Sequence, residues 1–200
     1  MEFILESENI KDYLISNEII DCDADNIIKL AEFLSEDPED EVSLVKKVYE
    51  YVRDDIHHSF DINGIRVTCK ASDVLQYKEG ICFSKSHLLA ALLRYLRIPA
   101  GFCYQKILKD EQNQQFILHG LNAVFLESMG KWIRLDARGN KNGLNAQFSV
   151  EEEILCYKIN PDKGEVDDKK VYVNPLPTVI EALTKSKTVD LLKLMLPKDF

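Results

Sequence analysis

The sequence predicts a single α+β domain, in which helices come first and an antiparallel sheet follows. Apolar residues recur at helical spacing through the first hundred positions, and strand-like apolar runs then fill residues 100–136. With 200 residues, of which 46% are hydrophobic, the chain is long enough to build one hydrophobic core. No internal repeat divides it. We therefore expect residues 1–200 to form one domain.

Two amphipathic helices are expected near the N-terminus. Asp25 is placed to cap a helix over Ile27–Leu34, which ends before Asp37-Pro38. A second helix is expected over Glu41–Asp54, because its apolar residues recur three and four positions apart. His57 and His58 follow this helix. They could line a cleft or bind a metal with Asp54 or Asp55, but we expect both histidines at the surface.

The longest helix is expected over Cys82–Leu96. Gly80 precedes it and Pro99 follows it, so residues that interrupt helices stand near both ends. Its leucines share one side of the predicted helix and are Leu88, Leu89, Leu92, Leu93 and Leu96. We expect this face to pack against the sheet.

The sheet is expected from three consecutive apolar runs. These runs are Ala100–Leu108, Phe116–Leu126 and Lys131–Asp136. A polar loop joins the first two runs, and Glu127–Gly130 joins the last two as a hairpin. A shorter strand is expected over Ile65–Cys69, and two further helices over Thr178–Thr184 and Thr188–Leu194.

The charge of the chain is acidic and uneven. The net charge is −9, and the first 61 residues hold 18 acidic and five basic side chains. Nucleic acids require a concentrated basic surface, which this sequence lacks, so we expect no nucleic-acid partner. No apolar run reaches the roughly 20 residues that cross a bilayer, and acids stand where a signal peptide is basic. We therefore expect a cytoplasmic protein that binds no membrane.

The five cysteines indicate a nucleophile rather than a disulfide framework or a zinc site. Their number is odd and no two form a Cys-x-x-Cys pair, so we expect no metal and no cofactor. Cys82 stands at a helix start, where free N–H groups and the helix dipole favour a thiolate and can bind an oxyanion. The other four cysteines are expected to be packing residues.

A thiol nucleophile needs a base, and the base needs a residue that orients it. His119 lies inside an apolar strand, where an imidazole is costly to bury unless it has a partner. Asp136 ends the following strand. If the hairpin loop has an even number of residues, the two side chains lie on the same face, either opposite or diagonal. Asp136 could then accept from one nitrogen of His119 while the other nitrogen faces Cys82.

Three separated motifs surround these residues. They are Gly80-Ile81-Cys82 with Lys85–Arg94 and Ile98-Pro99-Ala100, then His119–Asn122, then Trp132–Asn140. In order and spacing they resemble the motifs of the transglutaminase-like superfamily, whose members share a papain-like fold. The resemblance covers about residues 45–148 and leaves an acidic segment, 1–40, and a C-terminal segment, 150–200, unassigned. It implies that Cys82 is the nucleophile, His119 the general base and then acid, and Asp136 the residue that orients His119.

The sequence departs from this family at several positions. Members commonly carry Trp two residues after the histidine and Glu four residues after it, where this chain has Leu121 and Ala123. Members that remove glycans often carry paired Cys-x-x-Cys zinc motifs, which this sequence lacks. Gln76 lies six residues before Cys82, the spacing of the oxyanion glutamine in papain-like proteases. We include Gln76 as a candidate for that role, although coincidence also explains one polar residue at one offset.

The resemblance implies cysteine-dependent acyl transfer at an amide bond through a thioester, with a peptide, protein or small amide as substrate. Hydrolysis, as by a cysteine protease or amidase, is the reaction we favour, because a compact chain offers little surface for holding a second protein. A transamidase that joins a protein to an amine is the alternative. A binding protein that keeps the fold without catalysis is another.

Overall fold

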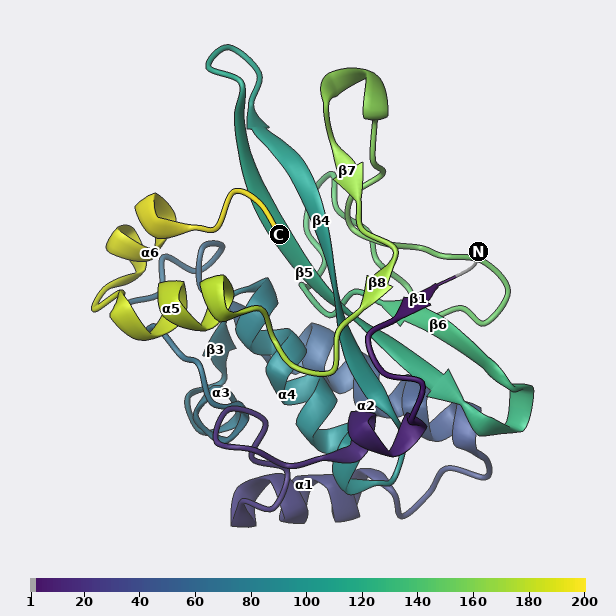
Figure 1. The fold of residues 1–200 in the computed structure, drawn as a ribbon. Coiled ribbons are helices and arrows are strands. Elements are labelled where there is room, and N and C mark those ends of the chain that lie inside the picture. The colour runs from purple at the N-terminus through teal and green to yellow at the C-terminus, as the bar shows by residue number, and fades with distance from the viewer. Residues whose placement is uncertain (1–2) are drawn as a thin grey trace.

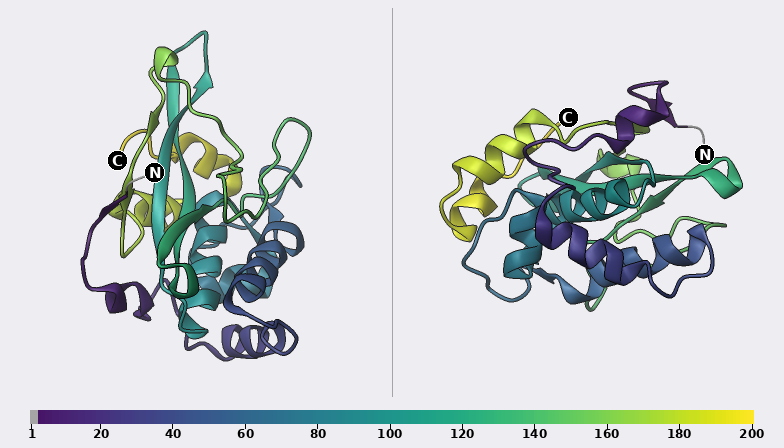
Figure 2. Two further views of the ribbon diagram at one scale, coloured as in Figure 1. Left: turned by 90° about the vertical axis from the view of Figure 1, so that its right-hand side faces the viewer. Right: turned by 90° about the horizontal axis from the view of Figure 1, so that it is seen from below.

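The structure is a computed structural model and describes residues 3–200. Helices from the first half of the chain pack against a curled antiparallel sheet, which confirms the expected α+β class (Figure 1). Figure 2 shows the sheet between two layers. The helices α2 and α4 lie on one side of the sheet, and the N-terminal segment lies on the other.

The first two helices form close to their expected positions. Helix α1 spans Asp25–Leu34, so Asp25 is its first residue rather than its cap. Helix α2 spans Glu41–Asp55 and is capped by Asp40, whose carboxylate accepts from the backbone N–H of Ser43 at 2.7 Å. The apolar side of α2 is buried, as its three- and four-residue spacing predicts.

The segment between α2 and the central helix differs from the expectation. Residues 65–69, predicted as a strand, run as irregular backbone. The strands here are instead β2, His57–His58, and β3, Glu79–Gly80, which pair in parallel. In the sequence they stand before and after helix α3, Ala71–Tyr77. Thr68, within the predicted strand, gives its hydroxyl hydrogen to the Glu79 carbonyl at 2.9 Å.

Helix α4 spans Cys82–Tyr95 and forms the centre of the core. We predicted one buried leucine face, but every residue from Phe83 to Arg94 is buried. The polar members of this stretch are held by hydrogen bonds. Arg94, for example, donates to the carbonyls of Ala100, at 2.9 and 3.1 Å, and Ile15, at 2.7 Å.

The main sheet runs in the order β6-β5-β4-β7. Its members are β4 (Ala100–Asp110), β5 (Gln115–Leu126), β6 (Lys131–Leu135) and β7 (Val166–Asp167). Strands β5 and β6 pair with Asn122 opposite Leu135 and Leu126 opposite Lys131. This register has the parity that we expected and would place position 136 opposite 121, diagonal to His119.

The remaining elements join the ends of the chain to the sheet. Near the N-terminus, β1 (Ile4–Leu5) pairs in parallel with β8 (Lys170–Val171). Helices α5 (Pro177–Lys185) and α6 (Val189–Met195) follow, and the chain then returns to β5, where the Leu118 N–H donates to the Pro197 carbonyl at 2.8 Å. Within residues 3–200, no helix is long and apolar enough to cross a bilayer.

Replacing Arg94 with Met should destabilise the fold. The substitution keeps most of the apolar stem but leaves the buried carbonyl of Ala100, and also that of Ile15, without their donor. We expect the free energy of unfolding in urea to fall by about 1–3 kcal/mol. An unchanged unfolding midpoint would contradict this role, and Arg97→Met, at a solvent-exposed position, is the matched control.

Candidate active site

Cys82 is the first residue of α4, and its side chain is half-buried. The turn before it is tight: Ile81 donates its N–H to the Ser84 hydroxyl at 3.0 Å, which in turn donates to the Ile81 carbonyl at 3.2 Å. A Cβ on Gly80 would lie 2.6 Å from the Ser84 hydroxyl oxygen, so the turn requires glycine there. As a result, the thiol sits at the N-terminal end of the helix, beside N–H groups that have no intrahelical partner.

His119 lies on β5 and is 2% exposed. The next residue, Gly120, lets the strand approach the first turn of α4, because a Cβ there would lie 2.5 Å from the ring of Phe83. His119 and Cys82 consequently line the same pocket. The Cys82 side chain also raises the pKa of His119, through a hydrogen bond and through its charge.

Asp136 follows directly after β6 and is 1% exposed. Its Oδ2 lies 2.8 Å from Nε2 of His119. The carboxylate also accepts from two backbone N–H groups, those of Arg138 at 3.1 Å and Cys156 at 2.9 Å. Because these two donors belong to the backbone, they hold the carboxylate in place independently of the imidazole.

Charge and hydrogen bonding outweigh burial in this pair. Burial acts to lower the pKa of His119, but the Asp136 carboxylate and the hydrogen bond to it raise the pKa above its ordinary value. Burial acts to raise the pKa of Asp136, but His119 and the two backbone donors lower it. An ionised Asp136 can only accept, so Nε2 of His119 carries the hydrogen and Nδ1 is the nitrogen left for Cys82.

Lys85, one turn after Cys82, supports the site through hydrogen bonds to the backbone. It is completely buried, and its ammonium donates to the carbonyls of Arg53, Ile56 and Arg138 at 3.1, 2.6 and 3.1 Å. Burial and the nearby Arg138 charge lower the pKa of Lys85. The lysine thus ties the end of α2 and the turn after Asp136 to α4. Sequence reasoning gave Lys85 no separate role, because a lysine within an apolar helix carries no signal of its partners.

Gln76 is not brought to this site. It is exposed on α3 and lines a different pocket, between α1 and α3. After α3 the chain reverses through Lys78, whose φ of 54° is left-handed, and then enters β3. The six-residue spacing therefore does not bring Gln76 into the pocket of Cys82, and the structure corrects the prediction that Gln76 is an oxyanion donor.

Known proteins resemble this chain in family and in fold. The family model of the Transglutaminase-like superfamily matches residues 28–137, more than half of the chain. The chain belongs to the transglutaminase-like superfamily. A crystal structure of a candidate cysteine protease from Cytophaga hutchinsonii matches this transglutaminase-like fold with a TM-score of 0.54 at 22% identity. The match covers 66% of this chain and 43% of that one, and at this identity it shows the fold alone. No curated protein sequence matches the chain.

The pocket of this transglutaminase-like domain has a volume of about 70 Å³. Besides Cys82 and His119 it is lined by His58, Phe60, Ile81, Ile107, Ile117, Leu118, Arg138, Tyr157 and Leu196. Leu196 comes from the C-terminal segment, whose Pro197 bonds to β5 and whose Asp199 pairs with Lys106 at 3.2 Å. Most of the wall is apolar, and the C-terminal segment closes one side of it.

His58 was expected at the surface, but it is 7% exposed and belongs to the pocket. His57, in contrast, is exposed as expected. The two-residue strand β2 turns His58 inward beside Gly80, two residues before Cys82. No periodic pattern marks a strand that short, so the sequence offered no signal for the burial of His58.

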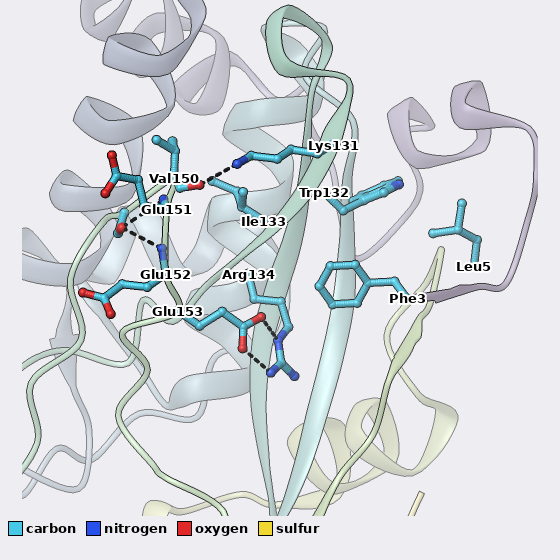
Figure 3. A pocket seen from close by; sticks show the side chains of 11 residues that line it. Phe3, Leu5, Lys131, Trp132, Ile133, Arg134, Val150, Glu151, Glu152 and Glu153 are labelled. Atoms are coloured by element: carbon cyan, nitrogen blue, oxygen red, sulfur yellow. Dashed lines mark hydrogen bonds and ion pairs between the residues drawn. The ribbon is translucent and has the colours of Figure 1, made fainter. Parts of the chain in front are cut away.

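A larger pocket, of about 360 Å³, lies along β6 and does not include Cys82, His119 or Asp136 (Figure 3). Arg134 is its central charge, and both ends of the guanidinium are engaged. Glu153 accepts from it at 2.6 and 2.8 Å, and Asp167 accepts at 2.6 and 2.9 Å. We interpret this pocket as structural, because Arg134 is already paired with two carboxylates and Lys131 already donates to the Val150 carbonyl at 2.6 Å.

Cys82 should be the first of the five thiols to react with iodoacetamide. It is half-buried in a pocket, whereas Cys22, Cys103 and Cys156 are 7%, 0% and 8% exposed. Burial raises the pKa of Cys69 to about 11, and it also raises the pKa values of Cys103 and Cys156. Mass-spectrometric mapping of the folded protein at pH 7 should find carbamidomethyl on Cys82 first. Earlier modification of Cys22 or Cys156 would contradict this expectation.

Asp136→Asn should change stability in a pH-dependent way. The folded pKa of His119 is raised, so its contribution is complete below the unfolded pKa of about 6.5 and is lost as pH rises through the folded value. The folded pKa of Asp136 is lowered, so its contribution is complete above about 3.9 and is lost as pH falls. Unfolding free energies of the two proteins should therefore differ most, by about 1.5–3 kcal/mol, between those pH values.

The same variant separates orientation from packing. Without the charge, the imidazolium beside Cys82 loses its stabilising partner, and we expect iodoacetamide to modify Cys82 more slowly. An Asp136 that only supports the fold would give a stability difference that is constant with pH. It would also leave the alkylation rate of the folded protein unchanged.

Proposed function

We propose that this transglutaminase-like domain is a cysteine enzyme that transfers an acyl group from an amide through a thioester on Cys82, with water as the acceptor. The observation that supports the proposal is the arrangement of a half-buried thiol and a buried imidazole in one pocket, with the imidazole bonded to Asp136 at 2.8 Å. In this proposal Cys82 and His119 are catalytic, and Asp136 is a positioning residue.

The proposed reaction has two steps. His119 Nδ1 takes the proton of Cys82, and the sulfur attacks the amide carbonyl carbon, forming a C–S bond. The C–N bond then breaks, and the leaving amine takes the proton from His119. In the second step His119 removes a proton from water, which attacks the thioester, and the proton returns to the departing sulfur. Asp136 stabilises the imidazolium that forms in both steps.

The dimensions of the pocket favour a small acceptor and an apolar acyl group. The volume of about 70 Å³ suits water better than the long side chain of a second protein. Ile107, Ile117 and Leu196 form an apolar wall beside the thiol, which favours an acyl group with a small apolar side chain. Leu121 and Ala123, which replace the Trp and Glu of other members, are completely buried in a separate small cluster and do not line the pocket.

The proposal predicts which variants lose activity and which product forms. Wild-type protein incubated with a library of short peptide amides should release free acids, and an acyl adduct should map to Cys82. Cys82→Ala should abolish both signals, and His119→Ala should reduce the rate by at least about 10²-fold, because general base and acid assistance is lost. Cys22→Ala, at a thiol that does not line the pocket, is the matched control.

The acceptor is decided in the same assay by adding a primary amine. Free acid as the main product supports hydrolysis. Incorporation of the amine into the product would instead mean that the reaction is transamidation. Turnover by Cys82→Ala would overturn the cysteine mechanism. An unmodified Cys82 with every peptide would favour a binding protein over an enzyme.

A further inference from the structure

His58 is a buried polar group that the proposed triad does not use. It lines the same pocket as Cys82 and His119, and its Nδ1 has no hydrogen-bond partner among the described residues. A buried polar atom without a partner is costly and rare in folded proteins. Of the five described residues with such an atom, His58 is the one that lines this pocket, where a ligand can supply the missing partner.

The backbone holds His58 rigidly beside the thiol. On β2 it stands opposite Gly80 of β3, two residues before Cys82. The flanking residues are both bonded to the segment that leads into α4: the His57 N–H donates to Lys78 at 2.9 Å, and the Ser59 N–H donates to Gly80 at 3.1 Å. Its ring also contacts Phe60 edge-on, with 5.4 Å between the centroids. This support is the kind of preorganisation that a fixed hydrogen-bond donor requires.

Two other polar groups of the pocket, Arg138 and His119, are already engaged. The guanidinium of Arg138 donates two hydrogen bonds to the Asp61 carboxylate, one of them at 2.9 Å. The ring of His119 is hydrogen-bonded to Asp136. Burial and the Arg138 charge lower the pKa of His58, so its imidazole is neutral at neutral pH. A neutral imidazole has one N–H to donate and one nitrogen that accepts.

We propose that His58 donates a hydrogen bond to the substrate carbonyl oxygen, and that it forms the oxyanion hole together with the backbone N–H of Cys82. This inference rests on the proposed acyl transfer. When the Cys82 sulfur bonds to the carbonyl carbon, the π pair of the C=O bond moves onto the oxygen. His58 stabilises that negative charge until the pair returns and the leaving group departs. In this proposal the oxyanion donor is therefore His58, on β2, and not the candidate Gln76.

Two reagents that both modify Cys82 separate this role from a structural one. p-Nitrophenyl acetate acylates the thiol through a tetrahedral oxyanion, whereas iodoacetamide alkylates it by direct displacement, without any oxyanion. Both rates are measured at pH 7.5 by mass spectrometry of the Cys82 peptide, with Cys82→Ala as the blank. His58→Phe keeps an aromatic ring without a donor, and His58→Gln restores a side-chain N–H.

His58→Phe should lower the acylation rate by about 10- to 100-fold, because one oxyanion donor is removed, and should leave the alkylation rate within about twofold. His58→Gln should recover much of the lost acylation. His57→Phe makes the same change at the exposed neighbour and should alter neither rate.

Three results would overturn the inference. Equal losses of acylation and alkylation in His58→Phe would mean that the residue only shapes the site. Unchanged acylation in His58→Phe would mean that it does not touch the oxyanion. If wild-type Cys82 is alkylated but never acylated, the proposed function itself fails and the oxyanion role fails with it, a pattern distinct from the other two.

Discussion

Helix α4 is enclosed by the rest of the chain, and this enclosure determines how the site is built. Because every residue from Phe83 to Arg94 is buried, each polar side chain on the helix needs a partner inside the protein. Lys85 finds three carbonyls, Arg94 reaches the start of β4, and His87 lies 2.7 Å from the Cys69 carbonyl. These bonds attach α2, β4 and the segment before α3 to one helix. Burial of α4 therefore positions the elements that surround the thiol.

Cys82, the first residue of α4, is less buried than the residues on either side of it. The thiol is half-buried, while the next residue, Phe83, is packed beneath Gly120 of β5. The strand that carries His119 is consequently held against the first turn of the helix. A side chain in place of hydrogen at position 120 would push the strand and the imidazole away from the thiol, since 2.5 Å leaves no room for it. Close packing and the proximity of sulfur and imidazole thus have the same physical origin.

The sequence contained enough information for the fold class, for α4 and for the meeting of His119 with Asp136. Those features depend on long periodic segments and on the parity of one hairpin, which local patterns report well. The burial of His58 depends on the pairing of two residues, His57 and His58, with two others that follow α3. Gln76 failed for a related reason, because a fixed offset along the chain ignores the reversal at Lys78. Pairings so short and so distant in sequence leave no pattern to read.

The site is divided between the part of the chain that the family shares and the part that follows it. Cys82, His119, Asp136 and His58 all lie within the matched residues 28–137. The later segment contributes the backbone N–H of Cys156 to the Asp136 carboxylate, and it contributes Tyr157 and Leu196 to the pocket wall. The matched residues thus supply the proposed reacting groups and most of the pocket wall, and the segment after the match adds Arg138, Tyr157 and Leu196 to that wall. Under the proposed function, a relative that differs after position 137 would keep the thiol, the imidazole and most of the wall. Its pocket would differ only where this later segment lines it, so the same chemistry could act on a different substrate.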